Sequence, residues 1–159
     1  MACKVLILCG PANSGKTTTL KTVISRRRFR QLGRNVFRVD GKIVCLRTGS
    51  PQERSGFCNL EGVRKKIRYL LGLCDRKGGS LVIIPFTIQF DPHINRRCIV
   101  LPIEELRRDG FEVTIVYLRR ADIGGIVEAD ALMSELGAER KRSGPTTVDF
   151  ERQAQELWR

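Results

Sequence analysis

The feature that most constrains this chain is a short apolar run that opens directly into a glycine-bounded loop. Residues 4–9 read Lys-Val-Leu-Ile-Leu-Cys, and Gly10-Pro11 follows at once. An apolar run of this length that ends in a turn is typical of a strand buried on both faces, as in a parallel sheet. Residues 16–32 contain no Gly or Pro, and aliphatic residues recur there at helical spacing. The amino-terminal part therefore predicts strand, loop and helix, which is the start of an α/β fold.

The rest of the chain continues to alternate. Asp40-Gly41 separates two β-branched runs and suits the two left-handed positions of a type I′ turn, so we expect an antiparallel hairpin over 36–47. Pro102 is expected in the first turn of a helix, where its missing N–H costs nothing. We further expect helices at 60–73, 102–108, 126–136 and 150–158, strands at 81–86 and 111–118, and loops at 48–59 and 140–142.

This pattern predicts a single domain over residues 1–159. At this length one core is large enough to be stable without disulfides or structural metals. Alternating strands and helices favour a mostly parallel central sheet with one antiparallel hairpin strand and helices on both faces. No apolar run approaches the roughly 20 residues that a membrane-spanning helix needs, so no membrane span is expected.

Charge is concentrated in one half of the sequence. The chain carries 29 Lys and Arg against 17 Asp and Glu, a formal net charge of +12. Residues 1–80 hold 18 basic and 4 acidic residues, whereas residues 81–159 are slightly acidic. Such a field attracts the phosphates of a small nucleotide or of a nucleic acid, and it also attracts other acidic partners. The alternative is a solvated basic surface without a ligand.

The six cysteines are irregularly spaced and include no C-x-x-C pair, which does not favour a zinc site. Most lie within apolar runs, where a free thiol packs as a small hydrophobic group. We therefore expect reduced, structural thiols, and reduced thiols are typical of a cytoplasmic protein.

A phosphate-binding pattern fills the loop after the first strand. Gly10, Pro11, Ala12, Asn13, Ser14, Gly15, Lys16 and Thr17 spell G-x-x-x-x-G-K-T/S between a predicted strand and a predicted helix. In this arrangement the backbone N–H groups and the helix N-terminus attract a β-phosphate, the lysine reaches the β- and γ-phosphates, and the hydroxyl of Thr17 can ligate Mg²⁺. Thr18, next along the helix, is included among the expected nucleotide-binding residues. The motif resembles that of P-loop NTPases, which implies their three-layer fold and Mg²⁺-dependent binding of ATP or GTP.

Two branches of that superfamily share features with this chain. The hairpin followed by Gln52-Glu53 resembles the second switch region of Ras-like small GTPases. Thr48 and Pro51 stand where that family has its Mg²⁺-linked Asp and its Gly, and residues 119–122 keep only the Asp of the guanine-reading motif. These departures favour ATP, or relaxed base choice, over GTP. P-loop kinases are the second branch.

The candidate catalytic residues follow from these resemblances. Lys16 is expected to act on the phosphates, and Glu53 either contributes a carboxylate to the site or lies in a solvated loop. Asp40 either holds metal or acts as a base, or else forms the Asp-Gly turn. Arg119, with Arg120, either faces the nucleotide as part of a lid over 119–145 or lies on the surface.

Three functions compete on the sequence alone. The first is an enzyme that hydrolyses a nucleoside triphosphate or passes its γ-phosphate to a small acceptor. The second is a nucleotide-dependent switch or assembly module with weak turnover, suggested by the absent strand-end Asp. The third is a basic nucleic-acid-binding protein, suggested by the charge of the first half and the run Arg26-Arg27-Arg28-Phe29-Arg30.

Overall fold

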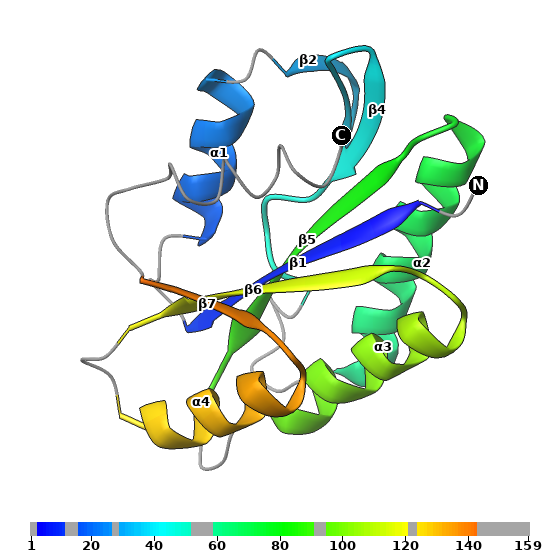
Figure 1. Cartoon of the computed structure of the whole chain (residues 1–159). Coiled ribbons are helices and arrows are strands. Elements are labelled where there is room, and N and C mark those ends of the chain that lie inside the picture. Colours follow the sequence, from blue (N-terminus) through cyan, green and yellow to red (C-terminus); the bar gives the residue numbers. More distant parts are fainter. Residues whose placement is uncertain are drawn as a thin grey trace.

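A computed structural model describes residues 3–11, 16–26, 29–51, 59–90, 95–120 and 124–142 (Figure 1). Its elements alternate along the chain as a sheet protein covered by helices requires. In chain order they are β1 (Lys4–Pro11), α1 (Lys16–Arg26), β2 (Arg30–Gly33), β3 (Val36–Val39), β4 (Lys42–Leu46), α2 (Leu60–Arg76), β5 (Leu81–Ile88), α3 (Arg96–Arg108), β6 (Val113–Arg119), α4 (Ile126–Glu135) and β7 (Glu139–Arg142).

The strands form one mixed sheet in the order β2-β3-β4-β5-β1-β6-β7. The pairings β4 with β5, β5 with β1, β1 with β6 and β6 with β7 are parallel, and β3 pairs antiparallel with both β2 and β4. The α/β class and the mostly parallel sheet are thus confirmed. β1, the strand that leads to the phosphate-binding pattern, lies inside the sheet between β5 and β6.

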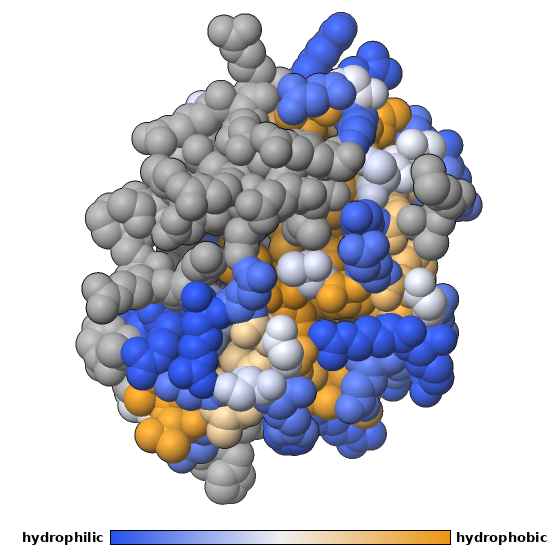
Figure 2. Space-filling view, in the orientation of Figure 1, coloured by the Kyte–Doolittle hydropathy of each residue, from blue (hydrophilic) through white to orange (hydrophobic). Residues whose placement is uncertain are grey.

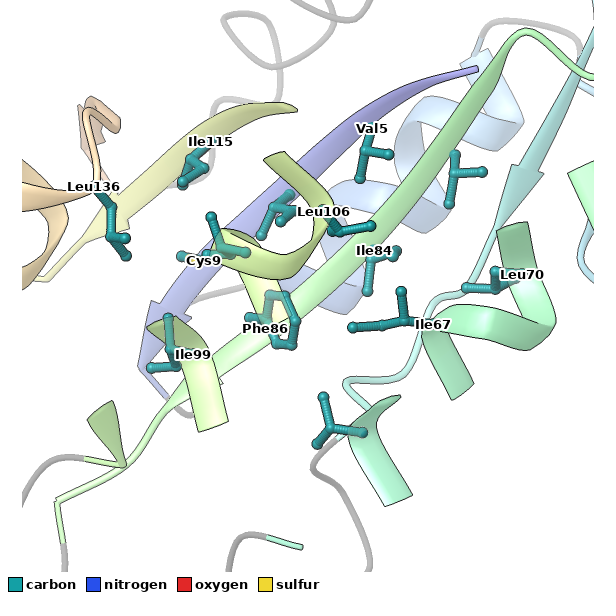
Figure 3. Packing of buried hydrophobic residues seen from close by; sticks show 14 of the residues in the cluster. Val5, Cys9, Ile67, Leu70, Ile84, Phe86, Ile99, Leu106, Ile115 and Leu136 are labelled. Carbon is teal, nitrogen blue, oxygen red and sulfur yellow. The ribbon is translucent and has the colours of Figure 1, made fainter. Parts of the chain in front are cut away.

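Two apolar clusters cover the two faces of the sheet, because side chains alternate along each buried strand. Val5, Ile7 and Cys9 of β1 pack in one cluster with α2, α3 and α4. Leu6 and Leu8 pack in the other cluster with α1. Figure 3 shows Ile84 and Phe86 of β5 beneath the helices of the first cluster. Helices therefore cover both faces, as expected.

Several local expectations are confirmed. The hairpin turn has Asp40 at φ 49° and Gly41 at φ 75°, both in the left-handed region that a type I′ turn requires. The helix expected at 60–73 forms as α2, and Asn59 caps it by accepting a hydrogen bond from the N–H of Gly62 at 3.1 Å. The expected strand at 81–86 and helix at 126–136 also form, with small changes at their ends.

Three expectations were wrong. The first helix ends at Arg26, and the exposed strand β2 follows it. α3 begins at Arg96, so Pro102 lies inside that helix and not in its first turn. The segment expected to be a basic loop at 140–142 belongs to β7, which pairs with β6. The lid expected over 119–145 includes residues outside the described ranges. The helix expected at 150–158 lies outside the described residues.

Pro85 occupies an unusual place, since it lies in the central strand β5 opposite Leu8 of β1. The peptide groups of Ile83 and Thr87 face the β4 side of the strand. The N–H of Arg47 donates to the carbonyl oxygen of Ile83 at 3.2 Å, and the N–H of Thr87 donates to Oγ of Ser50 at 3.2 Å. The nitrogen of Pro85 faces the same side, because peptide groups alternate along a strand. The β4–β5 ladder ends at Ile83, so this nitrogen has no strand partner there. No ladder bond is lost there.

No helix within the described ranges is both long and apolar enough to cross a lipid bilayer.

Candidate functional site

The carboxyl edge of the parallel strands is the natural place for a site. The connection after β1 runs through α1 to β2, in the half of the sheet that contains β4. The connection after the neighbouring strand β6 runs through α4 to β7, in the opposite direction. These two helices pack on opposite faces. In open α/β sheets, ligands bind outside the carboxyl ends of adjacent strands whose connections diverge in this way. β1 ends at Pro11 and β6 ends at Arg119 along this edge.

Lys16 is the charged residue that the fold buries at this edge. It starts α1 and is only 7% exposed. Its Nζ donates hydrogen bonds to the carbonyl oxygens of Gly10 at 2.9 Å and Pro11 at 2.7 Å. The ammonium thus lies against the end of β1, at the N-terminus of a helix whose dipole adds positive potential. Burial raises the pKa of the neighbouring Cys9 thiol to about 12, while the charge of Lys16 acts in the opposite direction.

Thr17 connects the start of α1 with the segment that follows β4. Its Oγ1 donates a hydrogen bond to the carbonyl oxygen of Thr48 at 3.2 Å. Thr48, which the resemblance to Ras-like GTPases aligns with their Mg²⁺-linked Asp, contributes a backbone carbonyl here. Because the hydroxyl proton is used in this bond, the lone pairs of Oγ1 are oriented away from Thr48.

The segment from Arg47 to Pro51 is fixed along the same edge. Arg47 Nε donates to the carbonyl of Gly49 at 2.8 Å, and Lys66 of α2 donates to the carbonyl of Pro51 at 2.8 Å. The hydroxyl of Ser50, a buried residue, accepts from the N–H of Thr87 in β5 at 3.2 Å. These contacts hold the segment beside α1 and β5, although the segment itself carries no carboxylate side chain.

Arg119 at the end of β6 is bound to an acid on α4. Its Nε donates to both oxygens of Asp130, at 3.1 Å each, and the hydroxyl of buried Tyr117 donates to Oδ1 of Asp130 at 3.1 Å. Burial, together with the hydrogen bond to Asp130, raises the pKa of Tyr117 well above its usual range. Arg119 therefore lies beside the end of β1 but on the α4 face. Leu118 packs in the α1 cluster, and Arg120 follows the end of β6.

Of the other sequence candidates, Asp40 lies apart from this cluster, Thr18 follows Thr17 on α1, and the remainder are not described. Asp40 forms the hairpin turn before β4, at the opposite end of β4 from the site. At about 3.3 Å per residue, the five residues of β4 put it more than about 15 Å from the carboxyl edge. Thr18 is exposed on α1. Glu53 and residues 12–15 (Ala12, Asn13, Ser14 and Gly15) lie outside the described residues.

Three cysteines form a cluster at the amino edge of the sheet. Cys3, Cys45 and Cys74 are free and buried, and hydrogen bonds link Cys74 to the other two. The bond with Cys74 raises the pKa of Cys3 and lowers that of Cys45. Cys98, in contrast, is disulfide-bonded, so the expectation that all six cysteines are reduced was wrong.

Comparison with models of known protein families and with curated proteins finds no match for this chain. The site's residues and geometry are therefore what the functional proposal rests on. Sequence reasoning located Lys16 and Thr17, but it missed Ser50, Tyr117 and Asp130. The first lies in a loop without a pattern, and the other two are ordinary core and helix residues until the fold brings them together.

Proposed function

We propose that this protein binds a nucleoside triphosphate with Mg²⁺ at the carboxyl edge beside β1, and that it hydrolyses the nucleotide or transfers its γ-phosphoryl group. ATP is the favoured nucleotide because the guanine-reading pattern is incomplete. The observation that carries the proposal is the placement of Lys16. A G-x-x-x-x-G-K-T pattern lies between a buried strand and a helix, and its lysine ammonium is buried at the junction of the two.

The chemistry of this junction suits a polyphosphate. In the described geometry the Lys16 ammonium is satisfied by main-chain carbonyls of Gly10 and Pro11 at 2.9 and 2.7 Å. A phosphate oxygen is a stronger, charge-assisted acceptor for an ammonium than a neutral carbonyl is. We therefore expect Lys16 to exchange these carbonyl contacts for the β- and γ-phosphates when nucleotide binds.

Thr17 fits the role of the protein ligand for Mg²⁺. Its hydroxyl oxygen is fixed by donation to Thr48, which leaves lone pairs to face a hard cation that prefers oxygen ligands. When bound, Mg²⁺ would supply charge neutralisation at the β- and γ-phosphate oxygens. Glu53 stays the sequence candidate for a carboxylate that orients a water molecule or acceptor hydroxyl.

The direct test is nucleotide affinity of Lys16→Ala against a matched control on the same helix. Lys21 is exposed on α1, so Lys21→Ala removes the same charge without touching the junction. We expect Lys16→Ala to weaken binding of a fluorescent ATP analogue at least tenfold, about 1.4 kcal/mol. Lys21→Ala should bind within about twofold of wild type, since an exposed charge acts mainly through a screened field. Unchanged affinity of a folded Lys16→Ala variant would refute the proposal.

A second test isolates the metal. Thr17→Ala should abolish the gain in ATP affinity that Mg²⁺ gives while keeping the affinity measured in EDTA, and Thr17→Ser should restore the gain. Titration of ATP against GTP with the wild-type chain then decides base preference. Release of phosphate with and without small hydroxyl acceptors separates hydrolysis from transfer, because only a transfer reaction yields a phosphorylated acceptor.

A further inference from the structure

The edge of the sheet farthest from β7 carries an unbalanced positive charge. All four residues of β2 are exposed, and Arg30, Arg34 and Arg38 are exposed on β2, its turn and β3. Within the described residues, none of these three side chains makes an ion pair or a hydrogen bond. Figure 2 shows strongly hydrophilic side chains projecting from the end of the molecule where β2 and β4 lie.

Two of these arginines directly oppose one another. Arg30 of β2 pairs with Arg38 of β3, which in turn pairs with Ile43 of β4. Residues opposite each other in an antiparallel pair have Cα atoms about 4.5–5.5 Å apart and project to the same face. Like charges in this position destabilise a sheet. An arrangement that costs stability in the isolated chain is relieved when an anion lies between the two guanidinium groups.

The same face continues onto α2. Ile43 packs in the cluster beneath α2, and the N–H of Ser80, just after α2, donates to the carbonyl of Ile43 at 2.9 Å. Arg38 and Arg30 therefore extend outward, one strand at a time, from the carboxyl end of α2. α2 makes its sheet contacts with β4 and β5, so this face of the hairpin extends beyond the helix.

The outer side of α2 adds an aromatic ring and another arginine. Tyr69 is 49% exposed, and Arg76 lies two turns further along the same stripe. A Cβ built on Gly72 would lie 3.3 Å from Nη1 of Arg76, so this guanidinium folds back over Gly72 toward the turn of Tyr69. Arg64 bonds to Glu105 of α3 from the other side of α2. The stripe of Tyr69 and Arg76 thus lies away from α3 and from the buried face of α2, on the outer surface of the helix.

We propose that these four residues, Arg30, Arg38, Tyr69 and Arg76, form a binding surface for a single-stranded nucleic acid, separate from the nucleotide site. The arginines contact successive phosphates, which carry no sequence information. Tyr69 offers a π-face on which an unpaired base stacks, and such stacking is worth about 1–3 kcal/mol per base. A duplex has no unpaired base to present to Tyr69, so the surface favours a single strand.

The salt dependence of binding gives a quantitative test. Binding of a fluorescein-labelled oligothymidylate is measured by anisotropy for the whole chain at several salt concentrations. Each phosphate contact to a single strand contributes about −0.7 to the slope of log affinity against log salt. Arg30→Gln with Arg38→Gln should therefore reduce the slope by about 1.4. The matched control is Arg97→Gln with Arg108→Gln, two exposed arginines of α3 that remove the same net charge elsewhere. It should leave the slope within about 0.3 of wild type.

The ring is tested separately. Tyr69→Ala should weaken oligothymidylate binding about fivefold to 160-fold without changing the salt slope, and Tyr69→Phe should keep most of the affinity. ATP affinity should be unchanged in all these variants, because the arginine pair lies beside the amino end of β4 and the nucleotide site lies at the carboxyl end of β1. Three results would overturn the proposal: equal slopes for the two double variants, equal affinity for a duplex of the same length, or equally effective competition by polyglutamate.

Discussion

The contact between Tyr117, Asp130 and Arg119 makes a prediction that separates two kinds of interaction. Asp130 on α4 accepts from a phenol hydroxyl that is buried and from a guanidinium whose side chain is 36% exposed. Asp130→Ala removes both partners at once. We expect the buried hydroxyl to account for most of the lost stability. Water can hydrogen-bond to the partly exposed guanidinium, but it cannot reach the buried hydroxyl.

The magnitude follows from the two environments. A buried hydroxyl that loses its acceptor costs about 1–3 kcal/mol, because no water replaces the bond. A partly exposed ion pair contributes about 0–1 kcal/mol. Asp130→Ala should therefore lower the free energy of unfolding by about 2–3 kcal/mol. Tyr117→Phe alone should cost about 1 kcal/mol, the net value of a hydrogen bond. In the Asp130→Ala background the same change should be neutral or stabilising, because it removes the unsatisfied group.

Urea unfolding of the four chains completes a double-mutant cycle. We expect a coupling energy of about 1–2 kcal/mol between the two positions, independent of salt. The cycle of Asp130 with Arg119→Met should give a smaller coupling that falls as salt is raised. Strict additivity of Tyr117→Phe and Asp130→Ala would refute the assignment of stability to the buried hydroxyl.

Three further predictions concern other parts of the fold. Ser50→Ala should lower the free energy of unfolding by about 1–3 kcal/mol in urea titrations, since the buried N–H of Thr87 loses this acceptor, whereas Ser50→Thr should retain most of it. The Arg64 guanidinium holds the pKa of Glu105 below its usual range, so the carboxylate contributes stability above about pH 4.3, the unfolded value, which is lost as pH falls through the folded pKa. The difference in free energy of unfolding between wild type and Glu105→Gln should accordingly be largest near neutral pH and should shrink toward zero in acid. A difference that stays constant with pH would contradict this. Gly125→Ala should lower the melting temperature measured by circular dichroism, because that residue has φ 80°, and an unchanged value would show that the left-handed turn tolerates a side chain.

Burial explains which strands could be predicted from the sequence. The runs that became β1, β5 and β6 are apolar because they are covered on both faces, and the Asp-Gly turn fixed the hairpin. β2 and β7 were missed because they are the two edge strands, with the sequences Arg-Gln-Leu-Gly and Glu-Arg-Lys-Arg. An edge strand needs no apolar alternation, and charged residues there prevent pairing with other chains. Hydrophobic periodicity therefore cannot distinguish such a strand from a loop.

The candidate site divides in the same way. Lys16 and Thr17 were predictable because a local pattern of glycines and a helix start defines them. Their partners were not, because the carbonyl of Thr48 lies 31 residues from Thr17 and carries no side-chain signature. Asp40 was ambiguous in the sequence, since an Asp before Gly fits both a turn and a strand end. Its left-handed φ and its distance from the carboxyl edge place it in the turn.

Pro85, in the middle of β5, follows the point where that strand passes from two flanking partner strands to one. Up to Ile83, β5 pairs with both β4 and β1. Beyond Ile83 the pairing with β4 ends, and the hydroxyl of Ser50 accepts a hydrogen bond from the N–H of Thr87. A change of length between 47 and 51 therefore disturbs side-chain contacts but breaks no rung of the ladder on the β1 flank. Insertions or deletions there are compatible with an intact β1–β5 ladder, but they would remove the contacts that Thr48 and Ser50 make with α1 and β5.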